Sequence, residues 1–240
     1  MVDTVNELDG KVAVVIGSLH NIGRGTAEEL ASAGAVVVVN GCSSRELGKE
    51  VANGIIKSSG KAIAIQVDIS DLDAAIRMMN QAALEFGGID ILVNNAGQVG
   101  DGGFVPEKLP VEVFEATLHT NLTGLWYCCQ EAGKRMLADG LGGSIINLTS
   151  VLGMGGSGDH PLAYQASKAG VINLTRNLAC SWADRNIRVN AIAPAYFPSE
   201  MTGPYLAVPG YETYINNATP LGRLGRLEEL AGPLLMLASE

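Results

Sequence analysis

The sequence predicts a three-layer α/β fold in which one doubly wound parallel sheet carries helices on both faces. Short apolar runs recur along the chain, and most are followed by a stretch with helical periodicity. The runs are apolar throughout and do not alternate with polar residues, as expected for strands buried on both faces. A glycine-rich turn separates the first run from the first helical stretch. No linker or internal repeat interrupts this order, so residues 1–240 are expected to form one domain.

Six apolar runs predict strands at residues 11–16, 35–39, 62–67, 89–93, 144–149 and 187–193. Helical patterns predict one helix that ends at Gly34 and others at residues 44–58, 72–86, 111–138, 162–183 and 227–239. Ser70 and Asp71 are equally good candidates for the cap of the third helix. Residues 195–218 form an irregular, proline-containing region, which is typical of a flap over a binding site.

Composition limits the possible partners. The net charge is −9 and the pI is about 4.8, which argues against nucleic acid as the main partner. No apolar run approaches the ~18 residues of a membrane span, so no membrane partner is expected. The four cysteines form no C-x-x-C pair, and the chain starts with a polar, acidic segment, so a cytoplasmic protein with reduced thiols is expected. His119 and His160 lack companion ligands, so no metal site is expected.

The glycine turn (residues 17–25) follows the first strand and opens the first helix. Backbone N–H groups and the positive end of a helix bind phosphate at such a position. These flanks favour nucleotide binding over a plain tight turn. Residues 94–97, Asn-Asn-Ala-Gly, end the fourth strand at the same edge of the sheet, where small residues let a ligand approach the backbone.

Tyr164 and Lys168 stand four residues apart in a helical stretch and therefore share one helix face. A phenol with a pKa near ~10 exchanges protons poorly at neutral pH, and a nearby ammonium group lowers that pKa. Ser150 follows the fifth strand, at the edge where open α/β sheets bind ligands. Taken alone, the Tyr-x3-Lys pair favours an exposed helix face over a catalytic pair, so its interpretation depends on the other motifs.

Together these motifs resemble the short-chain dehydrogenase/reductase family in its compact form, over nearly the whole chain. The motifs, in the family's order, are Gly17-x3-Asn21-Ile22-Gly23, Asn94-Asn95-Ala96-Gly97, Asn121, Ser150, Tyr164-x3-Lys168 and Asn190-x3-Pro194. The resemblance implies a Rossmann fold, a nicotinamide cofactor, and hydride transfer between that cofactor and a carbonyl or secondary-alcohol carbon. It also implies a homodimer or homotetramer that pairs through the helices at 111–138 and 162–183.

The resemblance also implies catalytic roles for four residues. Tyr164 is the general acid/base, and Lys168 lowers its pKa and holds the nicotinamide ribose. Ser150 binds the reacting oxygen. Asn121, in the middle of its helix, holds a water that links Lys168 to solvent.

Some cofactor contacts follow from the same resemblance, and the others follow from the positions of residues beside the glycine turn and the end of the second strand. Asp68 meets the adenine, Asn95 lies beside the ribose, and Thr202 contacts the carboxamide. The complete expected set is Gly17, Ser18, His20, Asn21, Ile22, Gly23, Asn40, Ser43, Ser44, Arg45, Asp68, Ile69, Asn95, Ala96, Gly97, Tyr164, Lys168, Pro194 and Thr202.

The sequence departs from the family's pattern at four points. Ile16 replaces a threonine whose hydroxyl usually braces the 94–97 loop, and Asn21 replaces the middle glycine of the turn. Asparagine tolerates left-handed backbone angles, so we expect the turn to survive with added bulk near the phosphates. Ala195 replaces the glycine after the sixth strand's proline. The sequence ends at Glu240, so the family's usual C-terminal strand and tail are expected to be absent.

The choice between NADP(H) and NAD(H) depends on the end of the second strand. An acidic residue there would bind the ribose 2′-hydroxyl and repel a 2′-phosphate, but the residue is the neutral Asn40. Ser43, Ser44, Arg45 and His20 would supply donors to a 2′-phosphate. Alternatively, Ser43 caps the next helix and Arg45 is solvated. The missing acid favours NADP(H), with NAD(H) as the alternative.

The substrate is expected to be a small carbonyl or alcohol compound of hydrophobic or mixed character. The expected pocket residues are mainly apolar: Val151, Met154, Tyr196, Phe197, Met201 and Tyr205. His160, in the loop before Tyr164, is a further candidate contact. The favoured function is a carbonyl reductase or secondary-alcohol dehydrogenase. The alternatives are a 3-oxoacyl-thioester reductase, a sugar or polyol dehydrogenase, and a nucleotide-binding sensor without turnover.

Overall fold

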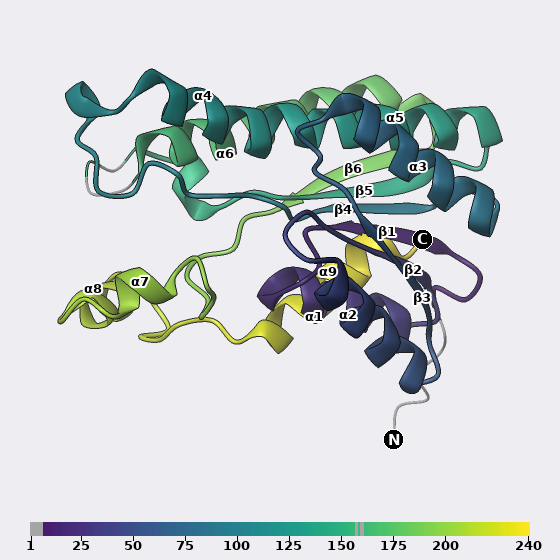
Figure 1. Ribbon diagram of the computed structural model, residues 1–240, viewed down its shortest axis with the longest axis horizontal. Helices are drawn as coiled ribbons and strands as arrows, with labels where there is room; N and C mark the ends of the chain where they lie inside the picture. The colour runs from purple at the N-terminus through teal and green to yellow at the C-terminus, as the bar shows by residue number, and fades with distance from the viewer. Residues whose placement is uncertain (1–6, 157, 159–160) are drawn as a thin grey trace.

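Six parallel strands form one sheet in the computed structural model, which describes residues 7–156, 158 and 161–240 (Figure 1). The strands are β1 (Val12–Ile16), β2 (Val36–Gly41), β3 (Lys61–Gln66), β4 (Ile91–Asn94), β5 (Gly143–Leu148) and β6 (Ile187–Ile192). Each lies within two residues of its predicted bounds. Their order is β3-β2-β1-β4-β5-β6, so the winding direction reverses between β1 and β4. Open α/β sheets bind ligands at such a reversal, outside the C-terminal strand ends.

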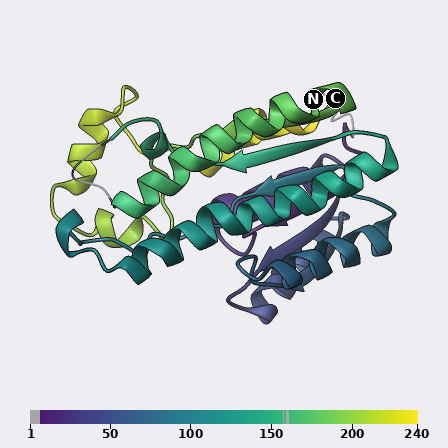
Figure 2. The ribbon, with the colours of Figure 1, turned by 90° about the horizontal axis from the view of Figure 1, so that it is seen from above.

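Helices cover both faces of the sheet, which confirms the predicted three-layer class (Figures 1 and 2). One layer holds α1 (Asn21–Ser32), α2 (Arg45–Lys57) and α9 (Ala231–Ala238). The other holds α3 (Leu72–Phe86), α4 (Val111–Leu118), α5 (Leu125–Asp139) and α6 (Leu162–Trp182). In Figure 2, α5 and α6 run side by side along the length of the molecule.

The strand sequences explain why both faces are covered. In β1, Val14 and Ile16 pack into the core under α3, α5 and α6, whereas Ala13 and Val15 pack into the core over α1, α2 and α9. All four side chains are fully buried. Each buried Val or Ile side chain contributes about 1.5–3 kcal/mol relative to exposure. A run that is apolar at every position is therefore what a central parallel strand requires.

The helix predicted at residues 111–138 is not continuous. A π-helix, η2 (His119–Gly124), separates α4 from α5, so the prediction of one regular helix is wrong here. A Cβ at Gly124 would lie 2.9 Å from the carbonyl oxygen of Ile69, so the helix packs closely on the loop after β3. Phe114, Leu118, Leu122 and Leu125 keep the spacing of a regular helix through this segment, so the hydrophobic pattern gave no sign of the π-turn.

Two helix caps that the sequence left open are settled by hydrogen bonds. The side chain of Asp71, and not that of Ser70, accepts the N–H of Ala74 and caps α3. Ser44, and not Ser43, caps α2, because its hydroxyl accepts the N–H of Leu47 at 3.1 Å.

The region predicted to be irregular contains two short helices, α7 (Gly203–Leu206) and α8 (Tyr211–Ala218). We call residues 195–218 the flap; in Figure 1 it projects at one end of the molecule, apart from the sheet. The 3-10 helix η5 (Leu227–Leu230) then leads into α9, so the predicted last helix begins with a tighter turn.

No helix among the described residues is both long and apolar enough to cross a membrane. The same part of the chain holds no cluster of three or more His, Cys, Asp or Glu side chains suited to a metal ion. All four cysteines are free thiols.

Candidate active site

A cavity of about 460 Å³ lies at the C-terminal strand ends, between the glycine turn, the 94–97 loop, the start of α6 and the flap. The expected cofactor contacts on its wall are Gly17, His20, Asn21, Ile22, Asn40, Ser43, Asp68, Ile69, Asn95, Ala96, Gly97, Tyr164, Lys168, Pro194 and Thr202. Four others, Ser18, Gly23, Ser44 and Arg45, lie outside the wall. The fold thus brings most of the predicted residues to one opening, although they are spread over 186 residues of sequence.

The glycine turn keeps a shape that can hold phosphate. Gly17 has φ +73°, and a Cβ there would lie 2.7 Å from the backbone of Ala96. Asn21 has φ +46°, so asparagine does adopt the left-handed conformation in place of glycine. The side chain of Asn95 donates to the carbonyl oxygen of Gly17 at 2.7 Å and fixes the turn to the end of β4. Gly23 packs so closely on Gly17 that a side chain has no room.

Ser18 and Asn40 brace the turn from behind. The Ser18 hydroxyl donates to the carbonyl oxygen of Val15 at 2.8 Å and accepts the N–H of Asn40 at 2.9 Å. The side-chain amide of Asn40 donates to the carbonyl oxygens of Ile65 and Val67 at 3.1 and 3.2 Å. The Ser18 side chain therefore stabilises the turn from outside the cavity wall. The side-chain amide of Asn40 is held toward β3.

The four donors expected around a 2′-phosphate do not form one cluster. The Ser44 hydroxyl is used by the α2 cap, and Arg45 is exposed outside the cavity wall. His20 and Ser43 line the cavity, but Nδ1 of His20 lies 3.4 Å from Oε1 of Glu200 in the flap. The first free N–H groups of a helix need an acceptor, and that requirement takes Ser44 out of the site.

Tyr164 and Lys168 share one face of α6, as predicted. Both side chains line the cavity and are buried, Tyr164 at 9% and Lys168 at 3% exposure. The Lys168 Nζ lies 5.7 Å from the centroid of the Tyr164 ring and donates to the carbonyl oxygen of Leu148 at 2.8 Å. Burial of the ammonium group lowers the pKa of Lys168 to about 8.

The pKa of Tyr164 differs from the sequence-based expectation. Burial of the phenol raises its pKa, and the hydrogen bond with the Ser150 side chain lowers it by less, so the net direction is upward. The predicted lowering of the Tyr164 pKa by Lys168 is therefore not found. The Ser150 hydroxyl also accepts the N–H of Leu152 at 3.2 Å, which fixes its position at the end of β5.

Asn121 lies in the π-helix and is fully buried. Its Oδ1 accepts the N–H of Gln98 at 2.8 Å, and its Nδ2 donates to the carbonyl oxygen of Gln98 and to the hydroxyl of Ser167. A Cβ at Gly97 would lie 3.4 Å from both Asn121 Oδ1 and Lys168 Nζ. The side chain of Asn121 thus joins the 94–98 segment to α6, and both of its amide hydrogens are used within the protein.

Asp68 and Thr202 line the cavity with side chains that already have partners. Oδ1 of Asp68 accepts the backbone N–H and the hydroxyl of Ser70 at 2.9 and 2.8 Å. The Thr202 hydroxyl donates to the carbonyl oxygen of Phe197 at 2.7 Å and so stabilises a turn within the flap. Of the expected pocket residues, Val151, Tyr196, Phe197, Met201 and Tyr205 line the cavity, whereas Met154 does not. His160 lies outside the described residues.

Sequence reasoning missed Asp101, which is 1% exposed. Its Oδ2 accepts the backbone N–H of Ala163 at 2.6 Å, directly before Tyr164, and so caps the first turn of α6. Its Oδ1 is buried without a hydrogen-bond partner within the described part of the chain. Helix caps are sought next to the helix they serve, and this one comes from 62 residues away, so no local signal could have found it.

Comparison with known proteins agrees with this geometry. A family model described as Enoyl-(Acyl carrier protein) reductase matches residues 17–240. The chain is 38% identical to a 3-oxoacyl-(acyl-carrier-protein) reductase of Synechocystis sp., with 97% of this chain and 91% of the relative covered. It is 36% identical to an L-rhamnose-1-dehydrogenase of Scheffersomyces stipitis, with 97% and 90% covered. A gluconate 5-dehydrogenase from Burkholderia cenocepacia, solved in complex with NADP and tartrate, has a TM-score of 0.92 at 30% identity, with 98% of this chain and 91% of that chain covered.

Proposed function

Because the chain belongs to the short-chain dehydrogenase/reductase family, we propose that it transfers a hydride between NADP(H) and a carbonyl or secondary-alcohol carbon, with Tyr164 as general acid/base. One observation carries the proposal. The Tyr164 phenol lines the cavity and is hydrogen-bonded to Ser150, with the Lys168 ammonium group buried directly behind it. A proton donor, a second hydroxyl for the reacting oxygen and a buried cation are the groups that carbonyl reduction requires.

The residues present fit a dinucleotide. The glycine turn opens α1 beside the cavity, and Gly17 and Gly23 leave its backbone free of side chains. When bound, the nicotinamide supplies or accepts the hydride. Tyr164 and Lys168 would face the nicotinamide end, and the glycine turn would hold the pyrophosphate. Asp68, Asn95 and Thr202 keep their assigned contacts to adenine, ribose and carboxamide as part of this proposal.

The protein's own residues handle the proton. In reduction, the Tyr164 phenol gives its proton to the substrate oxygen, which the Ser150 hydroxyl holds by a hydrogen bond. The Lys168 ammonium group stabilises the phenolate that remains, because opposite charges attract strongly in a dry site. Asn121 keeps the π-helix, the 94–98 segment and α6 in register, so that a water at this helix can return the proton from solvent.

NADP(H) is favoured over NAD(H) because β2 ends without a carboxylate. The residues from its end into the following turn that line the cavity are Asn40, Gly41, Cys42 and Ser43. The donors are fewer than the sequence indicated, so we expect a preference for NADP(H) and not an absolute requirement. Because the Asn40 side chain is held toward β3, the acid is placed at the exposed Cys42 of this wall: in Cys42→Asp, kcat/KM should shift toward NADH by ~10-fold or more, about 1.4 kcal/mol. An unchanged ratio would mean that another position selects the cofactor.

The test of the proposal is a fluorescence titration with NADPH and NADH, followed by a panel of ketones and secondary alcohols. Tight NADPH binding with turnover is the expected result. Binding without turnover would favour a nucleotide sensor, and no binding of either cofactor would mean that Asn21 spoils the glycine turn. We further propose that the protein is a homodimer or homotetramer, as the family resemblance implies. We also propose that it lies in the cytoplasm, where free thiols such as its four are expected.

A further inference from the structure

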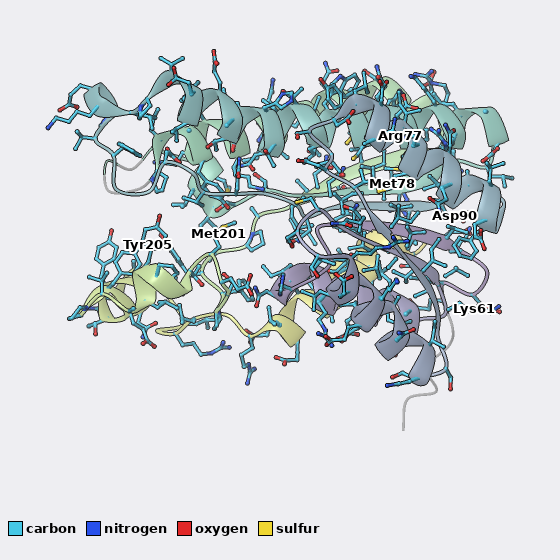
Figure 3. The ribbon with its side chains drawn as sticks, in the orientation of Figure 1. Lys61, Arg77, Met78, Asp90, Met201 and Tyr205 are labelled. Atoms are coloured by element: carbon cyan, nitrogen blue, oxygen red, sulfur yellow. The ribbon has the colours of Figure 1, made fainter. Side chains whose placement is uncertain are left out.

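The part of the cavity beyond Ser150 and Tyr164 is walled by tyrosines of the flap. Tyr196, Tyr205 and Tyr211 line it. The rings of Tyr205 and Tyr211 lie 5.9 Å apart at 32°, so together they present a broad aromatic surface. Figure 3 shows Met201 and Tyr205 on the side of the flap that faces α4 and α6. Such a surface can pack against the flat C–H face of a ring.

Within the described part of the chain, no cationic side chain beside the flap is free to bind an anion. Among the described residues of the cavity wall, the basic side chains are Lys168 and His20. Lys168 is buried at the reacting end and bonded to the carbonyl oxygen of Leu148. His20 lies on the glycine turn and is paired with Glu200. A carboxylate or phosphate on the substrate would therefore lose its water without gaining a cationic partner.

A buried charge beside the flap has the wrong sign for an anionic substrate. A Cβ at Gly102 would lie 2.5 Å from the Tyr205 hydroxyl, so Tyr205 reaches the segment that carries Asp101. Burial and then the negative charge of Asp101 raise the pKa of Tyr205. The Asp101 carboxylate has no ion-pair partner within the described ranges, and its charge therefore acts on the tyrosine wall.

Building on the proposed function, we infer that the substrate is an uncharged, ring-bearing secondary alcohol or the corresponding ketone. The tyrosine wall accepts the face of the ring, and anionic compounds are disfavoured by Asp101 and by the lack of a free cation on the described part of the wall. In oxidation, the ring carbon loses its hydrogen with both electrons to the oxidised nicotinamide. The hydroxyl proton passes to the Tyr164 phenolate, and a C=O double bond remains.

The test compares alcohols that differ in one property. 4-Hydroxycyclohexanecarboxamide and 4-hydroxycyclohexanecarboxylate have nearly the same shape and differ by one charge. Cyclohexanol and hexan-2-ol have six carbons each and differ by the ring. We expect kcat/KM to be at least ~10-fold higher for the amide than for the acid, and for cyclohexanol than for hexan-2-ol. A carboxylate used as well as the amide, or a chain used as well as the ring, would overturn the inference while the oxidoreductase function stands. Absence of turnover with every compound would overturn the proposed function and this inference with it.

Two flap variants with matched controls test whether the flap residues on the cavity wall determine the selectivity for charge and for the ring. Met201→Arg places a cation at the cavity and should raise the acid-to-amide ratio of kcat/KM by ~10-fold. Tyr214→Arg places the same cation on the flap outside the cavity and should leave the ratio unchanged. Tyr205→Leu should reduce the preference for the ring by ~3–10-fold, and Tyr214→Leu should not. Calorimetric binding of 4-oxocyclohexanecarboxamide to Tyr205→Leu gives a readout that does not depend on turnover, and unweakened binding would count against the tyrosine wall.

Discussion

The two sides of the cavity are built in different ways. On one side lies the floor, which we define as Ser150, Tyr164 and Lys168 on the cavity wall together with Asn121, which lies outside the wall. All four are buried and are held by hydrogen bonds to the π-helix, β5 and α6. On the other side the flap is largely exposed, and its ion pair with the glycine turn involves two solvated side chains. The difference indicates that the core fixes the chemistry, whereas the flap can change its selectivity without disturbing the fold.

The largest expected effect tests the floor. Tyr164→Phe removes the phenolic proton and keeps the ring, so kcat should fall by about 10²–10⁴-fold. Cofactor binding, measured by fluorescence, should stay within about 2-fold, because the phenyl ring still fills its place. Tyr214→Phe removes a hydroxyl from the exposed flap and should leave kcat unchanged. Strong residual activity in Tyr164→Phe would show that another group supplies the proton.

Lys168→Met tests whether the buried ammonium group, which the proposed function needs, destabilises the folded protein. Burial lowers the pKa of Lys168 from 10.5 to about 8, so between these values the unfolded chain binds more protons than the folded chain. The free energy of unfolding should therefore rise with pH across this window, by on the order of 3 kcal/mol in total. Below pH 8 the full cost of burying the ammonium group is present. Lys168→Met lacks that cost, so it should be inactive and yet more stable at pH 7.

Urea unfolding from pH 7 to pH 10 measures this difference. The free energy of unfolding of the wild type should approach that of Lys168→Met as the pH rises. Lys57→Met, which changes an exposed lysine at the end of α2, should follow the wild-type pH dependence. Parallel curves for the wild type and Lys168→Met would mean that the ammonium group is better solvated than the structure indicates.

How far the sequence could predict the two sides also differs. The apolar runs predicted all the strands and their layer, because a buried parallel strand leaves a direct record in composition. The positions of Tyr164, Lys168 and Ser150 followed from helix spacing and strand ends. Neither the π-helix nor the cap from Asp101 is indicated by composition or spacing. The first changes the backbone without changing the pattern, and the second joins segments that are far apart in the chain.

The sequence also could not predict the directions in which polar side chains point. Asn40 and Ser44 were assigned to the cofactor from their positions, and they do lie near the end of β2. Their polar atoms are instead taken by backbone groups that burial or helix geometry leaves unpaired. Local hydrogen bonds therefore decide which polar residues near a site remain free to bind a ligand, and spacing alone does not show them.

A smaller effect concerns the support beneath the floor. Oδ1 of Asn94 is buried without a hydrogen-bond partner among the described residues, and Ile16 is its neighbour in the register of β1 and β4. The Nδ2 of the same side chain donates to Asn147 Oδ1 at 2.9 Å. A hydroxyl at position 16 would lie on the same face as Asn94 and could donate to the free oxygen. Threonine at this position is what the family resemblance led us to expect.

The comparison that tests this is between Ile16→Val and Ile16→Thr, which have almost the same shape. Burying an unpaired hydroxyl normally makes threonine the less stable of the two by about 1–3 kcal/mol. Here we expect Ile16→Thr to be more stable than Ile16→Val by about 1 kcal/mol in urea unfolding. Val14→Thr, on the same face of β1, has no orphaned acceptor beside it among the described residues and should show the usual loss. A loss of the same size at both positions would mean that the hydroxyl does not reach Asn94.

The smallest expected effect is on the flap. Glu200→Gln removes the charge that pairs with His20, and both side chains are largely solvated. Exposed ion pairs contribute about 0–1 kcal/mol, so the KM for NADPH should change by less than ~3-fold and the melting temperature should hardly move. The small change should shrink further at 0.5 M salt, because screening weakens exposed pairs. A change of ten-fold or more in KM would show that this pair locks the flap over the cofactor. The flap would then be part of the binding machinery, and the contrast between a fixed floor and a loosely held flap would fail.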